Sequence, residues 1–136
     1  MKVLLATSKP FAVEAVEAIP NIIETAGHQL VKLEGYDDRS QLLEAVKGMD
    51  AIIVRSDIVD RSVIEAASDV KLIVRAGAGY DNVDLAAASL ANIAVMNTPG
   101  QNANAVAELV FGMMLYLQRN HFDGSVGREL KDRRLG

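Results

Sequence analysis

The segment Val70-Lys71-Leu72-Ile73-Val74 leads directly into Arg75-Ala76-Gly77-Ala78-Gly79, a pattern that indicates a strand with a tight turn at its carboxyl end. A short, mostly apolar run rich in β-branched residues is typical of a strand buried on both faces of a parallel sheet. The glycines permit a sharp turn and a close approach of the backbone to a ligand. The segment therefore favours an α/β fold and marks a candidate binding turn.

Other segments have the same strand-like character, and a stretch with helical spacing lies between each strand and the next. The expected strands cover residues 2–7, 29–34, 51–54, 70–74 and 93–96, and the expected helices cover residues 11–26, 40–47, 61–67, 83–90 and 104–119. Such alternation predicts a parallel sheet with helices on both faces. Since residues 2–7 are apolar and residues 29–34 alternate polar with apolar, we expect a five-stranded, flavodoxin-like sheet in the order 2-1-3-4-5.

The first predicted helix contains an unusual residue and a recognisable end. Pro20 would cost about 3 kcal/mol in a helix interior, so we expect a kink or a restart there. Gly27 is suited to the C-cap, where a left-handed backbone conformation is common. The helix should therefore end close to Gly27.

The composition is that of a soluble globular protein with one main domain. A chain of 136 residues, half of them hydrophobic, can bury a substantial core. It contains no cysteine, which excludes disulfides and thiolate metal sites and fits a cytoplasmic setting. The start lacks a signal peptide, and the net charge of −4 argues against nucleic-acid binding. The uncharged residues 85–107 could span a bilayer, but their polar centre at residues 97–102 excludes a membrane segment.

Three basic residues stand out because most of the chain is acidic. Before position 119 there are nine Lys and Arg residues against fifteen Asp and Glu residues. Lys9, Arg55 and Arg75 follow predicted strands, and ligands bind parallel sheets beyond the carboxyl ends of the strands. An arginine fork grips a carboxylate or a phosphate, and the amides of the glycine turn add further donors. We therefore expect a site for a small anion at this edge of the sheet.

These residues also allow other interpretations. The glycine turn lacks the third glycine of the dinucleotide-binding pattern G-x-G-x-x-G, since Asn82 occupies that position. The turn could simply join a strand to a helix, and each arginine could pair with Asp57 or Asp81 instead of a ligand. Asn97 and Asn102 could bind a ligand or act as turn and helix-capping residues.

Longer motifs give the chain a family resemblance. In chain order they are residues 51–56 (AIIVRS), 74–85 (VRAGAGYDNVDL), 95–99 (VMNTP) and 104–109 (NAVAEL). In sequence and spacing they resemble the D-isomer-specific 2-hydroxyacid dehydrogenases, and within that family the 3-phosphoglycerate dehydrogenases. The resemblance covers essentially the whole chain. It implies a two-domain enzyme that oxidises the 2-hydroxyl of 3-phosphoglycerate with NAD, in serine biosynthesis.

The resemblance also implies roles for individual residues. The implied substrate-binding set is Arg55, Ser56, Arg75, Ala78, Gly79 and Asn102. Arg55 and Ser56 match residues near the phosphate or carboxylate end of the substrate, whereas Arg75 and the turn amides match residues that hold the carboxylate region. Val106 lies where the long helix of the family meets the cofactor.

By the same resemblance, the chain represents only part of such an enzyme. We expect a substrate-binding domain over residues 1–100, an interdomain and dimerisation helix over residues 101–120, and a linker over residues 121–136 toward an NAD-binding Rossmann domain. The catalytic histidine, carboxylate and arginine of the family match no residue here, and His28 and His121 fit surface positions. We therefore expect this chain to bind small anionic hydroxyacids without turnover, to bind no cofactor tightly, and to hold no metal.

Other functions with the same topology are distinguishable from the sequence. A signalling receiver needs carboxylates after its first and third strands, where this chain has Ser8-Lys9 and Arg55-Ser56. A flavin-binding protein is disfavoured because the chain has few aromatic residues and none after the fifth strand. An assembly module is the alternative we keep. The 104–119 helix is apolar on both sides, and a helix of this kind is normally buried all round. We expect it to form a homodimer contact, unless it folds back over its own domain.

Overall fold

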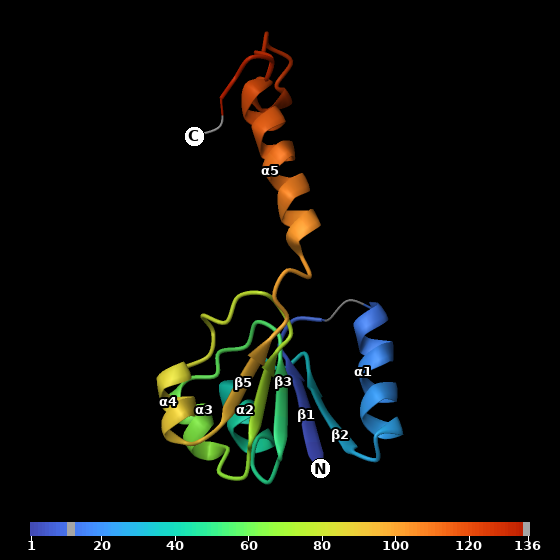
Figure 1. Cartoon of the computed structure of the whole chain (residues 1–136), viewed down its shortest axis with the longest axis vertical. Coiled ribbons are helices and arrows are strands. Elements are labelled where there is room, and N and C mark those ends of the chain that lie inside the picture. The colour runs from blue at the N-terminus through green and yellow to red at the C-terminus, as the bar shows by residue number, and fades with distance from the viewer. Residues whose placement is uncertain (11–12, 135–136) are drawn as a thin grey trace. The chain divides into compact units, whose positions relative to one another are not determined.

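The computed structural model describes residues 1–10 and 13–134 and contains a five-stranded parallel sheet (Figure 1). The strands are β1 Lys2–Thr7, β2 Gln29–Glu34, β3 Ala51–Val54, β4 Leu72–Arg75 and β5 Ala94–Asn97. The helices are α1 Val13–Thr25, α2 Arg39–Ala45, α3 Arg61–Ala66, α4 Leu85–Leu90 and α5 Ala103–Gln118, with a short 3-10 turn, η1, at Asn120–Phe122. The strand order β2-β1-β3-β4-β5 confirms the predicted α/β, flavodoxin-like topology.

The chain divides into two compact units, Met1–Pro99 and Gly100–Gly136. The first unit holds the whole sheet and helices α1 to α4, and the second holds α5 and η1. None of the helices described in either unit is long and apolar enough to cross a membrane. The residues predicted to bind ligand are therefore distributed over both units.

The core of the first unit lies between the central strands and three short helices. Leu4, Ile52 and Ile73, one from each central strand, are completely buried. They belong to one cluster with residues of α2, α3 and α4 or their ends, namely Leu42, Val46, Val63, Ile64, Ala87 and Ala88. Helix α1 contacts the edge strand β2, beside which it lies in Figure 1. Because burying each large aliphatic side chain contributes about 1.5–3 kcal/mol, the central strands form a stable base for their carboxyl-terminal loops.

Two strands begin later than predicted, for a physical reason. Val70 and Ile93 are buried, at 2% and 7% exposure, yet both precede the strand to which the sequence pattern assigns them. Their amides donate to Ala67 and Ala88 in the preceding turns instead of to a neighbouring strand. The apolar pattern of the sequence thus predicts which residues are buried, but not which of them pair with a neighbouring strand.

Helix α1 corrects one prediction and confirms another. The sequence predicts a kink or a restart at Pro20; the helix continues from Val13 to Thr25 with Pro20 inside it, which excludes the restart. Proline has a backbone angle compatible with a helix, and the loss of one amide donor is a cost that tertiary packing can offset. Gly27 is the predicted C-cap: its φ is +75°, and His28 N–H donates to Ile23 O at 3.1 Å. The predicted helical start at residues 11–12 lies outside the described residues.

Candidate functional site

The register of the sheet places the two predicted arginines at the same edge. Arg75, the last residue of β4, is paired with Val54 of β3 on one side and with Asn97 of β5 on the other. The amide of Ala76 donates to Val54 O at 2.8 Å, which ties the turn after β4 to the end of β3. Arg55 follows Val54 directly. The arginines therefore stand at the carboxyl ends of neighbouring strands, as expected for a ligand-binding edge.

The glycine turn after β4 is held by its carbonyl groups. Thr98 N–H donates to Gly77 O at 3.0 Å, and the side-chain amide of Asn97 donates to Ala78 O at 2.8 Å. Within residues 1–10 and 13–134, the amides of Ala78 and Gly79 donate to no acceptor. The turn is thus fixed from one side while two neighbouring donors stay available to an anion. Asn97, considered above as a ligand contact, instead holds the turn.

The arginines are not neutralised by nearby carboxylates. Arg55 Nη1 donates to the carbonyl oxygen of Pro10 at 2.6 Å, and the Nε of Arg75 is buried. In the part of the chain that the structure describes, the ion pairs are Arg39–Asp60 and Lys47–Glu44, and neither includes these arginines. The alternative in which Asp57 or Asp81 pairs with an arginine is therefore not found.

Asp57 has a different and unexpected function at this edge. Its side chain is only 5% exposed, and its Oδ1 accepts hydrogen bonds from Ser8 N–H at 2.7 Å and from the Tyr36 hydroxyl at 2.6 Å. Its carbonyl oxygen accepts a hydrogen bond from the Asn82 side chain at 2.7 Å. Asp57 thus joins its own loop after β3 to the loops that follow β1, β2 and β4.

A cavity lies beside this carboxylate. Its volume is about 290 Å³, and its lining residues are Ser8, Tyr36, Asp37, Arg39, Leu42, Ser56, Asp57 and Ile58. Burial raises the pKa of Tyr36 well above its usual value, and the hydrogen bond to Asp57 and the negative charge of that carboxylate act in the same direction. Tyr36 therefore stays a neutral hydrogen-bond donor. Ser56, a predicted substrate contact, lines this cavity.

The first unit contains most of the predicted site residues. They are Arg55, Ser56, Arg75, Ala78 and Gly79. Asn102 and Val106 belong to the second unit. Asn102 stands at the N-cap position of α5, although its side chain makes no capping hydrogen bond, and Val106 is 49% exposed on that helix.

His28 lies apart from the arginines of the first unit, and His121 belongs to the second unit. His28 directly precedes β2, at the amino-terminal edge of the sheet and thus opposite the edge that holds the arginines. His121 is in η1, where its ring centre lies 4.8 Å from that of Tyr116. Over the described residues, no group of three or more His, Asp or Glu side chains is placed to hold a metal ion.

The glycine turn does not fit the pyrophosphate of NAD. A dinucleotide-binding turn leads straight into a helix whose free amino-terminal amides hold the phosphates. Here Tyr80–Val83 separates the turn from α4, and the Asp84 carboxylate occupies the start of that helix by accepting from Ala87 N–H at 2.9 Å. A second negative charge at this position would be repelled. The turn after β4 thus lacks the features of a dinucleotide-binding turn.

Known proteins share both the sequence and the fold. The model of the D-isomer specific 2-hydroxyacid dehydrogenase family, catalytic domain, matches residues 4–126. A D-3-phosphoglycerate dehydrogenase of Methanocaldococcus jannaschii is 46% identical over 83 residues, which is 60% of this chain and 16% of that protein. A D-3-phosphoglycerate dehydrogenase of Archaeoglobus fulgidus is 39% identical over 121 residues, which is 88% of this chain and 21% of that protein.

A solved structure extends this similarity to three dimensions. The crystal structure of NAD⁺-bound 3-phosphoglycerate dehydrogenase of Entamoeba histolytica matches with a TM-score of 0.92 and 51% sequence identity. The match covers 98% of this chain and 44% of that one. The chain therefore spans less than half the length of these relatives.

Proposed function

Because the chain belongs to the D-isomer specific 2-hydroxyacid dehydrogenase family, whose model matches residues 4–126, we propose that it forms the substrate-binding part of an NAD-dependent enzyme that oxidises 3-phosphoglycerate. One observation carries this proposal. Arg55 and Arg75 end adjacent strands, they form no ion pair among the described residues, and the available amides of Ala78 and Gly79 follow the second arginine. This arrangement suits a small ligand with two anionic groups.

Each part of the edge would contact a different part of the ligand. Arg75 and the amides of Ala78 and Gly79 would hold the carboxylate region, because an arginine fork and backbone amides both donate to carboxylate oxygens. Arg55 and Ser56 would approach the phosphate end. Asn102, in the second unit, would add a further polar contact. Together these contacts would orient the 2-hydroxyl of the ligand, but they would not oxidise it.

We further propose that these 136 residues bind substrate without turning it over. The proposed divisions are a substrate domain over residues 1–100, an interdomain and dimerisation helix over residues 101–120, on which Val106 would meet the cofactor, and a linker over residues 121–136 toward an NAD-binding domain. The misfit of the glycine turn to NAD and the placement of His28 at the opposite edge of the sheet from the arginines support this proposal. The absence of cysteine fits a cytoplasmic location.

Calorimetric titration with 3-phosphoglycerate tests the proposed function. We expect binding by the wild-type chain and a loss of at least about tenfold in affinity for Arg75→Met and for Arg55→Met, since each removes charge-assisted hydrogen bonds. Lys47→Met is the matched control, because Lys47 is exposed and pairs with Glu44. Equal affinity in all four proteins would contradict the site. NADH formation by the chain alone would contradict the lack of turnover.

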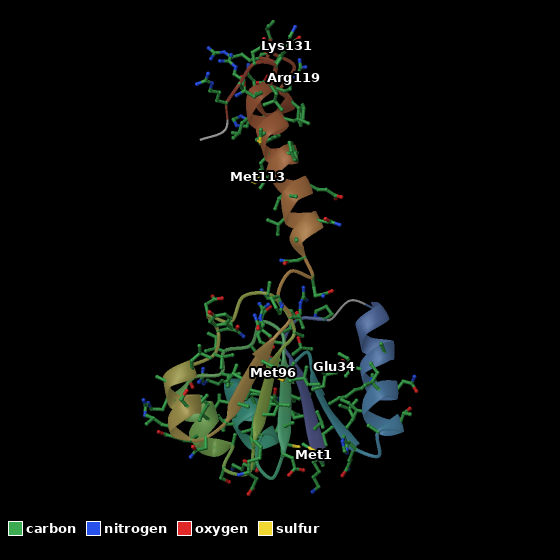
Figure 2. The ribbon with its side chains drawn as sticks, viewed as in Figure 1. Met1, Glu34, Met96, Met113, Arg119 and Lys131 are labelled. Atoms are coloured by element: carbon green, nitrogen blue, oxygen red, sulfur yellow. The ribbon has the colours of Figure 1, made fainter. Side chains whose placement is uncertain are left out.

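Helix α5 favours a second function, homodimer assembly. It buries none of its residues, and Figure 2 shows side chains around it, with Met113 labelled. The large apolar residues exposed along it are Val106, Leu109, Val110, Phe111, Met113, Leu115, Tyr116 and Leu117. Because contiguous exposed apolar surface of this kind is typical of an interface, we propose a homodimer through residues 104–119.

Sedimentation equilibrium tests the homodimer. We expect a dimer at high micromolar concentration and dissociation on Leu109→Lys, which places a charge in the apolar surface. The neighbouring Glu108→Lys is the matched control, because it adds the same side chain at a position that is already charged. A monomeric wild-type chain at that concentration would refute the homodimer.

A further inference from the structure

We propose that Gly77 is a positioning residue for Arg75, because its missing Cβ leaves the space in which the Arg75 guanidinium lies. The inference rests on the proposed function, in which Arg75 binds the carboxylate region of the ligand. It concerns how Arg75 is oriented before any ligand arrives. Gly77 contacts the arginine and acts through it.

The distances around Gly77 define this space. A Cβ built on Gly77 would lie 1.5 Å from Nη1 of Arg75, 2.5 Å from its Cζ and 3.3 Å from its Nε. All of these distances are shorter than ordinary van der Waals contact, and the nearest one is as short as a covalent bond. The guanidinium therefore lies directly against the Cα of Gly77, where only a glycine leaves room.

The backbone beneath the guanidinium is fixed on both sides. Ala76 N–H donates to Val54 O at 2.8 Å, and Thr98 N–H donates to Gly77 O at 3.0 Å, so the turn is bonded to the ends of two other strands or their loops. Gly77 N–H itself donates to Arg75 O at 2.9 Å. A new Cβ at position 77 would therefore displace the arginine side chain and leave the turn in place.

The same packing determines which nitrogens of Arg75 a ligand can reach. The Nε atom is buried and has no hydrogen-bond partner. Over the described part of the chain, Nη1 and Nη2 form no hydrogen bond or ion pair, and unlike Nε they are not buried. With Nε buried, the terminal nitrogens are the donors that Arg75 has left for a carboxylate. A guanidinium held in this way loses less conformational entropy on binding than a free one.

Backbone conformation does not explain the glycine. Gly77 lies outside the left-handed region, whereas Gly100 has a φ of +76° with nothing within 4 Å of its Cβ position. An alanine at position 77 is therefore compatible with the backbone. The substitution tests only whether Arg75 needs the space that the new Cβ would fill. Gly112, in α5, also has open space at its Cβ position and is a matched Gly→Ala control.

The test compares Gly77→Ala and Gly112→Ala with the wild-type chain. The affinity for 3-phosphoglycerate is measured by calorimetry, and the Nε–H resonance of Arg75 is followed by NMR, with Arg75→Lys used to assign it. We expect Gly77→Ala to keep the wild-type Tm within a few degrees, to shift the Arg75 resonance, and to lower the affinity about tenfold. Gly112→Ala should leave the Arg75 resonance and the affinity unchanged.

The double variant Gly77→Ala with Arg75→Lys separates positioning from a general effect on the turn. Lysine has no planar fork to displace, so Gly77→Ala should lower affinity much less in the Arg75→Lys background. An unchanged Arg75 resonance in Gly77→Ala, or an equal loss of affinity in both backgrounds, would overturn the positioning role. A shifted resonance in a chain whose wild type binds no 3-phosphoglycerate would support the positioning and overturn the proposed function. If Gly77→Ala fails to fold, recovery of folding in the double variant supports the clash with Arg75, and failure of both variants overturns it.

Discussion

The Asp57 carboxylate is buried at the edge of the sheet that carries the two arginines, directly after Arg55 and Ser56. It accepts one hydrogen bond from a backbone amide and one from a phenol, both on Oδ1, while Oδ2 is buried without a partner in the described structure. Burying a carboxylate oxygen without a hydrogen-bond partner raises the free energy of the folded chain, so the packing of the surrounding loops must offset this cost.

Replacing Asp57 with alanine should destabilise the fold. The change leaves the Ser8 amide and the Tyr36 hydroxyl without an acceptor, and each unsatisfied buried donor costs about 1–3 kcal/mol. Asp57→Asn keeps an oxygen acceptor and should lose less. Urea unfolding measures both variants. An Asp57→Ala chain as stable as the wild type would mean that the carboxylate does not fix these loops.

Tyr36 should make stability depend on alkaline pH. Burial and the Asp57 carboxylate raise its pKa above the usual value of about 10, so the unfolded chain releases this proton at a lower pH than the folded chain. The stabilisation is therefore complete below about pH 10 and is lost as the pH rises further. Urea unfolding between about pH 8 and pH 11 should show a steeper decline for the wild type than for Tyr36→Phe. Parallel curves would contradict this assignment.

At the scale of elements, the short helices of the first unit depend on aspartate N-caps. Asp38, Asp60 and Asp84 precede α2, α3 and α4, and each side chain accepts a hydrogen bond from an amide in the first turn. Hydrogen bonds from Ser40 and from Ser62 lower the pKa values of Asp38 and Asp60, respectively. Helices of six or seven residues are marginal alone, so caps and packing must stabilise them.

Removing one of these caps should have a small, measurable cost. Asp84→Ala removes the acceptor for Ala87 N–H and should lower the free energy of unfolding by about 1 kcal/mol. Asp84→Asn retains a capping oxygen and should be close to the wild type. Thermal unfolding of the two variants measures the difference. Equal losses for alanine and asparagine would show that charge, and not capping, stabilises α4.

The sheet could be predicted from the sequence because its signals are local. Apolar runs and the alternation of residues 29–34 predict the strands and the edge position of β2, and the sheet register then places Arg55 and Arg75 together. The Asp57–Tyr36 hydrogen bond joins positions far apart in sequence, and no local pattern marks it. The available signal in the sequence was the acidic residue Asp57, which directly follows the predicted site residues Arg55 and Ser56. The Arg75–Gly77 contact needs a side-chain conformation, which composition and spacing do not specify.

At the scale of the whole molecule, the family membership and the fold agree, and the chain spans 44% of its Entamoeba histolytica relative. The sheet edge in the first unit offers two arginines and two available amides, which we propose bind an anion. Helix α5 in the second unit offers exposed apolar surface, which suits assembly. The proposed substrate binding therefore rests mainly on the first unit, with Asn102 added by the second, and the proposed assembly rests on the second unit.

The central claim is that a small anionic hydroxyacid binds at the carboxyl ends of β3 and β4. NMR titration of the ¹⁵N-labelled chain with 3-phosphoglycerate tests it most directly, because each amide reports on its own surroundings. We predict that the largest shift changes occur at the amides of Ser56, Ala78 and Gly79, and that they are absent in Arg75→Met. Shift changes confined to other parts of the chain, or none at millimolar ligand, would contradict it.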